Sequence, residues 1–281
     1  MRFSDIIGNK KVIGLLEQGI RLKTLYPSLI FHGIEGIGKK LAALTIAKGF
    51  NCLSETEKPC NHCSLCRGID NFNDPDVRLI MPERYDERLD KKDRKSLNIK
   101  IDQIRELVMD ITLRPYHSSK KIYIIDYAEM LTEEASNSLL KTLEEPPSYA
   151  IIILITTAFY SLLPTIRSRC WGVPFHPIPA KEIEKYLLKK KNVDTQSAKK
   201  LSLISEGSIG KAMQADPKDF TMRSRMLCTM IEKALDGDLS FIIKGAEDIS
   251  KNIEEFREHR LRLCRGDLLG TIANQTCFVS T

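Results

Sequence analysis

A glycine-rich segment, residues 31–40, constrains the fold of this chain more than any other part of its sequence. It fits the pattern G-x-x-x-x-G-K, and its glycines and lysine are Gly33, Gly36, Gly38 and Lys39. Glycines allow backbone N–H groups to close around a phosphate, and the lysine adds a positive charge. We expect an apolar strand over residues 28–31 before the loop and a helix over residues 39–50 after it. Strand, glycine loop and helix in this order predict a phosphate-binding loop in an α/β domain.

Two groups that ATP hydrolysis requires are missing from the expected nucleotide site. Lys40 stands where Ser or Thr normally binds Mg²⁺. Asp126 ends an apolar strand in the place of a metal-organising carboxylate, but Tyr127 follows where a glutamate would activate water, and Glu129 is expected to be solvated. Loss of the water-activating group alone costs about 10²–10⁴-fold in rate. The sequence therefore predicts a degenerate site without ATPase activity of its own, with ATP binding left open; its residues are Gly33, Gly36, Gly38, Lys39 and Asp126.

Apolar strands alternate with amphipathic helices through the first part of the chain. Beside the strand before the glycine loop, strands are expected over residues 77–81, 121–126 and 151–156. Helices are expected over residues 10–23, from Asp102 as an N-cap, and from Thr132 to the residue before Pro146. Residues 84–96, dense in charge, are expected to form an exposed loop. The alternation predicts a parallel, doubly wound sheet whose site lies at the carboxyl ends of the strands.

Four cysteines form a compact cluster in the sequence. Cys52, Cys60, Cys63 and Cys66 follow the spacing C-x₇-C-x₂-C-x₂-C. Four thiolates suit a tetrahedral Zn²⁺ site, and a site closed by four protein ligands is structural because no position is left for substrate. Buried or redox-active cysteines are the alternative, and the two overlapping C-x₂-C spacings favour zinc over it. His62 is expected to be a bystander.

Composition limits the class of protein without identifying it. The 281 residues suffice for two or three domains, and the net charge of +6 is a mild basic excess that leaves nucleic-acid contact open. The N-terminal residues carry no apolar signal segment, and the longest apolar run, Ala150–Ile155, is too short to span a bilayer. Eight cysteines without an export signal indicate thiols or metal ligands. We expect a cytoplasmic protein with no membrane partner.

The chain changes character after about residue 172. Pro174, Pro177 and Pro179 lie close together and predict a domain boundary. Beyond them, helices are expected over residues 181–191 and 195–206, and another helix after Ser208 as its cap. Residues from about 216 onward predict a third, all-helical region.

Several of these segments resemble the clamp-loader branch of the AAA+ ATPases. The resemblance is carried by Phe3–Gly8, the glycine loop, the four-cysteine insertion, Asn73–Asp76, Ile101–Arg105, Asn137–Pro147 and Ser168–Cys170. It covers roughly the first 170 residues, and its last two segments are highly specific. It implies an AAA+ P-loop domain over residues 1–172 with a zinc module at 52–66. A helical lid domain would then occupy residues 173–215, and a helical collar residues 216–281.

The resemblance also implies roles for residues that the motifs alone do not explain. In this family the Ser-Arg-Cys segment supplies an arginine finger to the ATP site of a neighbouring subunit, which here assigns that role to Arg169. Thr156 or Thr157 occupies the sensor-1 place at the end of a strand. Gly210 stands where active loaders carry the sensor-2 arginine, and Lys211 beside it is expected to be solvated.

The function implied is that of a non-hydrolytic subunit in the clamp-loader ring of DNA polymerase III. Its partners would be the gamma/tau and delta subunits and, through the ring, the sliding clamp and primed DNA. The chain would then be an accessory subunit of a DNA-directed DNA polymerase. The main alternative is an active AAA+ ATPase of the gamma/tau type, and a zinc-dependent redox protein is a third possibility.

Overall fold

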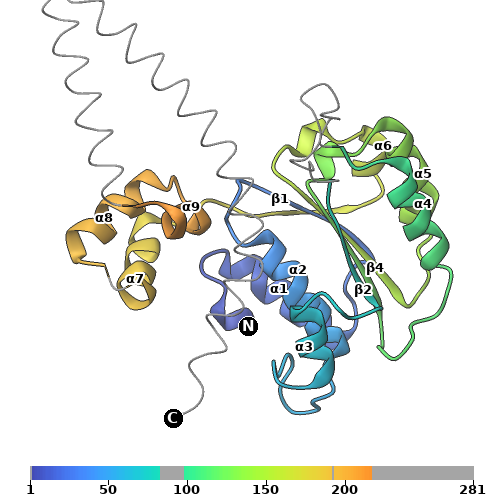
Figure 1. The fold of residues 1–281 in the computed structure, drawn as a ribbon, viewed down its shortest axis with the longest axis horizontal. Helices are drawn as coiled ribbons and strands as arrows, with labels where there is room; N and C mark the ends of the chain where they lie inside the picture. Colours follow the sequence, from blue (N-terminus) through green and yellow to red (C-terminus); the bar gives the residue numbers. More distant parts are fainter. Residues whose placement is uncertain (1, 83–97, 192, 217–281) are drawn as a thin grey trace, which may run out of the picture. The chain divides into compact units, whose positions relative to one another are not determined.

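The computed structural model describes residues 2–82, 98–191 and 193–216 (Figure 1). The chain divides into two compact units, Met1–Gln214 and Ala215–Thr281, so all but two of the described residues belong to the first. The expected loop over 84–96 lies outside the described residues, as does the expected collar beyond Asp216. No helix among the residues described is both long enough and apolar enough to cross a bilayer.

A five-stranded parallel sheet forms the centre of the first unit. Its strands are β1 (Ser28–His32), β2 (Val77–Ile80), β3 (Lys121–Asp126), β4 (Ala150–Thr156) and β5 (Trp171–Pro174). They lie in the order β2-β3-β4-β1-β5, and every neighbouring pair is parallel. β3 and β4 are buried along their whole length, as their continuous apolar runs predict for central strands covered on both faces. The expected parallel, doubly wound sheet is confirmed.

Helices cover both faces of this sheet, with α1 and α2 on one side and α4, α5 and α6 on the other (Figure 1). The helices before β5 are α1 (Lys10–Leu22), α2 (Lys39–Asn51), α3 (Ser64–Asp70, in the cysteine segment), α4 (Ile101–Asp110), α5 (Glu133–Glu144) and α6 (Pro164–Arg167). After the sheet come α7 (Ala180–Lys190), α8 (Thr195–Ile204) and α9 (Ile209–Gln214). Short 3-10 turns lie at Phe3–Asp5, Ala128–Met130 and Phe159–Ser161.

One hydrophobic core lies between the sheet and the α4–α5 layer. The buried residues of this core include Tyr123, Ile125, Ile152, Leu139 and Leu143. Because strand side chains alternate between faces, Tyr123 and Ile125 of β3 face this layer together. The Tyr123 hydroxyl donates a 2.5 Å hydrogen bond to Asp110 Oδ2, so this buried polar group is satisfied.

Three details of the fold differ from the sequence-based expectations. β5 was not expected, since a four-residue segment with a glycine and a proline has no strand signature, and it exists because β1 pairs with it at the sheet edge. α3 was not expected within the cysteine segment. Asp102 is not an N-cap, because α4 begins at Ile101 and its N-cap is Lys100. The Gln103 side chain accepts a 3.1 Å hydrogen bond from the backbone N–H of Lys100.

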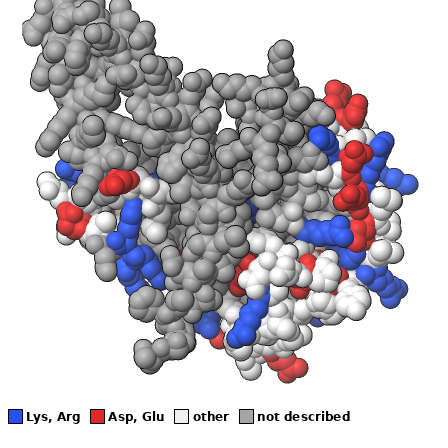
Figure 2. Space-filling view, in the orientation of Figure 1, with Lys and Arg blue, Asp and Glu red and all other residues white. Residues whose placement is uncertain are grey.

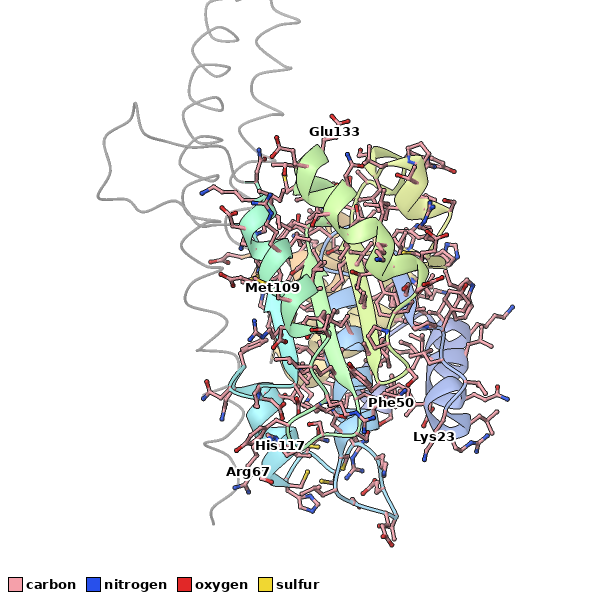
Figure 3. All side chains as sticks on the ribbon, turned by 90° about the vertical axis from the view of Figure 1, so that its right-hand side faces the viewer. Lys23, Phe50, Arg67, Met109, His117 and Glu133 are labelled. Atoms are coloured by element: carbon pink, nitrogen blue, oxygen red, sulfur yellow. The ribbon has the colours of Figure 1, made fainter. Side chains whose placement is uncertain are left out.

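Asp76 organises the loop that precedes β3. Its carboxylate accepts hydrogen bonds from the backbone N–H groups of Tyr116 (2.7 Å), His117 (3.0 Å) and Ser118 (2.9 Å). Burial by itself would raise the pKa of Asp76, but these bonds hold it below its usual value. Asp74 lies beside it, with Oδ2 3.6 Å from Nε2 of His117, which Figure 3 labels. The three backbone donors on the Asp76 carboxylate therefore hold residues 116–118 in place before β3.

Asp76→Asn should lower the free energy of unfolding by about 1–3 kcal/mol at pH 7, because a neutral amide replaces an ion that accepts three bonds. The pKa is lower in the folded than in the unfolded chain, so this contribution is present above the unfolded pKa and is lost as pH falls through the folded one. Urea unfolding should therefore show a difference that shrinks below about pH 4. Asp102→Asn, which changes an exposed carboxylate, is the control; equal losses in both variants would contradict the assignment.

Candidate functional site

The glycine loop joins the carboxyl end of β1 to the first turn of α2, at the edge of the sheet where the expected site lies. Gly33, Gly36 and Gly38 all have positive φ values, 144°, 73° and 100°. At Gly33 a Cβ atom would come within 2.3 Å of the carbonyl oxygen of Phe175, so no other residue fits there. The structure thus brings the predicted loop residues together in the predicted context.

Lys39 folds back onto its own loop. Its Nζ donates hydrogen bonds to the carbonyl oxygens of Gly33 (2.5 Å) and Ile34 (2.8 Å). Burial lowers the pKa of Lys39 to about 8, although the charges of Asp126 and Glu129 act in the opposite direction. The lysine that would contact phosphate is therefore held by loop carbonyls.

Lys40 lies against the carboxylate that would organise a metal ion. Lys40 Nζ is 3.3 Å from Oδ2 of Asp126, and it also donates to Met81 Sδ at 3.4 Å. Asp126 is the last residue of β3, and its other carboxylate oxygen accepts a 3.1 Å bond from the backbone N–H of Tyr127. An ammonium group therefore occupies the neighbourhood of the carboxylate to which a divalent cation would bind.

Glu129 belongs to this site, contrary to the expectation that it is solvated. Its Oε1 accepts hydrogen bonds from the backbone N–H (3.2 Å) and hydroxyl (2.6 Å) of Thr157, and its Oε2 is buried. Burial would raise the pKa of Glu129, but the hydroxyls of Thr157 and Thr156 lower it. The turn at Ala128–Met130 carries Glu129 back toward the end of β4, which spacing along the chain does not reveal.

The start of α9 packs directly against the glycine loop. Ser208 Oγ donates a 2.7 Å hydrogen bond to the carbonyl oxygen of Glu35. The backbone N–H of Gly210 donates a 2.8 Å hydrogen bond to the carbonyl oxygen of Gly36. A Cβ atom on Gly210 would lie 2.8 Å from Gly36 Cα. The position expected for a sensor-2 arginine therefore has no room for a side chain in this arrangement.

The four cysteines gather in a separate cluster. One sulfur atom from each of Cys52, Cys60, Cys63 and Cys66 lies within 4.8 Å of the others, and His62 is not part of the group. The cluster follows the end of α2, about 20 Å from the glycine loop by the length of that helix. Figure 3 shows sulfur atoms near the labelled Arg67, at the end of the molecule away from Glu133.

Backbone N–H groups donate hydrogen bonds to three of these sulfurs. Cys60 donates to Cys52 Sγ at 3.3 Å, Cys63 to Cys60 Sγ at 3.4 Å, and Cys66 to Cys63 Sγ at 3.4 Å. Burial would raise the pKa of the Cys60 thiol, but hydrogen bonds from the backbone of His62 and Cys63 lower it to about 6. Burial raises the pKa of Cys66, which a metal ion would reverse by binding the thiolate.

The chemistry of this donor set fits a tetrahedral metal site. Four soft sulfur ligands with N–H···S bonds around them are features of closed Zn²⁺ sites. Lys48, at the end of α2, ties the cluster to the core, because its buried Nζ lies 2.5 Å from Asp70 Oδ1 and 3.2 Å from Asn61 Oδ1. The four cysteines could therefore hold one metal ion that links α2 to α3.

Arg169 lies in the turn that follows α6. Its Nε is 3.0 Å from Glu144 Oε2, its Nη1 donates a 3.1 Å bond to the carbonyl of Thr165, and its side chain is 31% exposed. Arg167, two residues earlier, lies 5.6 Å and 5.4 Å from the ring centroids of Phe159 and Tyr160. The partnership with Glu144 was missed from the sequence, where 25 residues separate the two.

Proteins similar in sequence to this chain include several subunits of bacterial DNA polymerase III. The DNA polymerase III subunit delta' of Bacillus subtilis is 35% identical, over 76% of this chain and 61% of the relative. The subunit gamma of Buchnera aphidicola from Acyrthosiphon pisum is 34% identical, over 75% and 56%. The B. subtilis subunit tau is 34% identical, over 87% and 41%. The matched part of the chain thus spans less than two thirds of each of these relatives.

A solved structure with a similar fold is RuvB of Thermotoga maritima, a Holliday junction branch migration motor. It is 16% identical, covers 82% of this chain and 66% of its own, and superposes with a TM-score of 0.50, which establishes a shared fold. A family model described as "DNA polymerase III, delta subunit" matches residues 8–179, which is more than half of the chain. With an AAA+-type sheet and this match, the chain belongs to the DNA polymerase III delta-subunit family.

Proposed function

We propose that this chain is a non-hydrolytic, delta-prime-type subunit of a DNA polymerase III clamp loader. The observation that carries the proposal is the contact of Lys40 Nζ with Asp126 Oδ2 at 3.3 Å. The cation that balances this carboxylate comes from the chain itself, and no hydroxyl follows Lys39 to bind Mg²⁺. Phosphoryl transfer depends on such a metal ion, so the site would not support turnover.

Two further features of the glycine-loop site support the absence of ATP hydrolysis there. Tyr127 stands where a water-activating glutamate would be needed, and its φ of 58° places it in the left-handed region. Gly210, packed on Gly36, cannot carry a sensor-2 arginine in this arrangement. The proposal leaves ATP binding open, since the glycines and Lys39 are retained.

The role proposed for the chain in the ring is to complete an ATP site on a neighbouring gamma/tau subunit. Arg169 would approach the transferring phosphoryl group and neutralise its charge, as arginine fingers do. Delta would be another neighbour, and the ring would place the sliding clamp on primed DNA. Cys52, Cys60, Cys63 and Cys66 would hold a structural Zn²⁺, and the division at residues 172 and 215 into P-loop, lid and collar regions remains part of the proposal.

Direct DNA contact by this chain is not part of the proposal. On the face seen in Figure 2, basic and acidic side chains of the described residues are interspersed over the region of α4, α5 and α6. Two of the ion pairs in this part of the chain join Arg105 to Asp102 and Arg169 to Glu144. Over this region of the described surface, Figure 2 shows no extended basic stripe, the usual electrostatic footprint of duplex binding.

The isolated chain should hydrolyse no ATP above background, because the site has neither a hydroxyl to bind Mg²⁺ after Lys39 nor a water-activating carboxylate after Asp126. A steady-state assay on the purified chain with Mg²⁺–ATP measures this. Turnover near about 1 s⁻¹, the low end of typical enzymes, would instead favour the second candidate, an active gamma/tau-type ATPase. Co-purification with gamma/tau and delta, followed by ATPase assays with and without this chain, tests the ring itself.

A further inference from the structure

A carboxylate lies at the C-terminal end of α5, where negative charge is unfavourable. Glu144 is the last residue of that helix, and Glu145 follows as its C-cap. The C-terminus of a helix carries partial negative charge, so an acidic side chain there is destabilising unless a cation compensates it. Glu145 is exposed, as Glu144 is, but the pairing with Arg169 belongs to Glu144. The two adjacent glutamates thus differ in what they contact.

The compensating cation is the proposed arginine finger. Arg169 Nε donates to Glu144 Oε2 at 3.0 Å, and Arg169 Nη1 donates to the carbonyl oxygen of Thr165 at 3.1 Å. The backbone of Arg169 is also held, since its N–H donates a 3.1 Å hydrogen bond to the carbonyl oxygen of Ile166. The guanidinium is therefore fixed from two elements, the end of α5 and the first turn of α6, which Figure 1 shows as neighbours.

These contacts leave the guanidinium able to bind an anion. A guanidinium carries five N–H donors, and the two bonds use one each, on Nε and Nη1. The side chain remains 31% exposed, and that of Glu144 58% exposed. A long side chain that is already ordered loses less entropy when it engages a partner, which is the general benefit of preorganisation.

We propose that Glu144 is a positioning residue, which holds Arg169 in the orientation needed to reach an anionic phosphoryl group on a neighbouring subunit. The inference rests on the proposed function, because it presupposes that Arg169 acts in trans. Glu144 itself does not touch the nucleotide; it acts through the guanidinium that it orients. The opposite role, a restraint that Arg169 must escape before it can act, predicts a change of rate in the other direction.

The test is a reconstituted ring of gamma/tau, delta and this chain, carrying Glu144→Gln. The amide has the same shape but no charge, so the orientation of Arg169 weakens without loss of a core contact. We expect kcat at the ATP site next to this chain to fall on the order of 10-fold, with the KM for ATP unchanged, because misalignment affects the transition state and not ground-state binding. Glu145→Gln, the matched control, should leave both constants as they are.

A double-mutant cycle separates positioning from general damage. In a ring that already carries Arg169→Ala, Glu144→Gln should have no further effect, because the residue it orients is gone. Equal effects of Glu144→Gln with and without Arg169, an unchanged kcat, or a raised kcat would each overturn the positioning role. If Arg169→Ala alone leaves turnover normal, the proposed trans function fails. If it abolishes turnover but Glu144→Gln changes nothing, only this inference fails.

Discussion

A clamp-loader ring carrying Arg169→Ala should leave one ATP site nearly inactive. The rate constant at the site facing this chain is expected to fall on the order of 10³–10⁵-fold, the usual contribution of an arginine finger. The reason is electrostatic: the guanidinium neutralises charge that develops on the transferring phosphoryl group, where little water is present to screen it. Alanine removes both the charge and the fork of donors.

Single-turnover hydrolysis of ATP prebound to the ring measures this effect. Because the gamma/tau sites not adjacent to this chain are unchanged, a defined fraction of the bound ATP should persist long after the rest is consumed. Arg169→Lys should give an intermediate rate, since a point charge replaces a planar fork. Arg105→Ala is the control, because Arg105, on α4, is another arginine that is paired with a carboxylate. Normal turnover by an assembled Arg169→Ala ring would refute the finger assignment.

Removing one cluster cysteine should release the metal and unfold the segment around it. The purified chain is expected to contain about one equivalent of zinc, and Cys66→Ser to contain almost none, because three thiolates hold the ion far less tightly than four. Structural zinc sites of this kind contribute roughly 10–16 kcal/mol of binding free energy in small peptides. Cys66 is fully buried, so its replacement should open the cluster and make residues 52–66 sensitive to protease.

Metal analysis and thiol titration together check this result. Cys170→Ser is the control, since Cys170 is a partly buried free thiol outside the cluster and its loss should leave the zinc content unchanged. In the wild-type chain the four cluster thiols should be shielded until a chelator is added. A chain purified without metal whose cluster thiols react at once, or a Cys66→Ser variant with full zinc content, would favour the redox alternative.

Much of the architecture could be predicted from local patterns. The strands over residues 121–126 and 151–156 are continuous apolar runs, which central parallel strands require. A helix was expected to start near Thr132, and Ser208 was expected as an N-cap; both side chains accept the bond that defines a cap, from the backbone N–H groups of Ala135 and Lys211. The glycine loop and the cysteine cluster were found for the same reason: close spacing in the sequence already limits how these residues can meet.

By itself, the sequence determined four of the five strands, the glycine loop, the cysteine cluster and the absence of a metal-binding hydroxyl, because each of these depends on residues near one another in the chain. The tertiary structure decided the rest. It paired Lys40 with Asp126, Glu144 with Arg169 and Gly36 with Gly210, and it made an edge strand of residues 171–174. These contacts join segments that are distant in the chain, and no local propensity or spacing encodes them. Lys40 meets Asp126 where parallel strands bring their carboxyl ends to one edge, whereas Glu144 meets Arg169 at the opposite edge, where β4 and β5 begin.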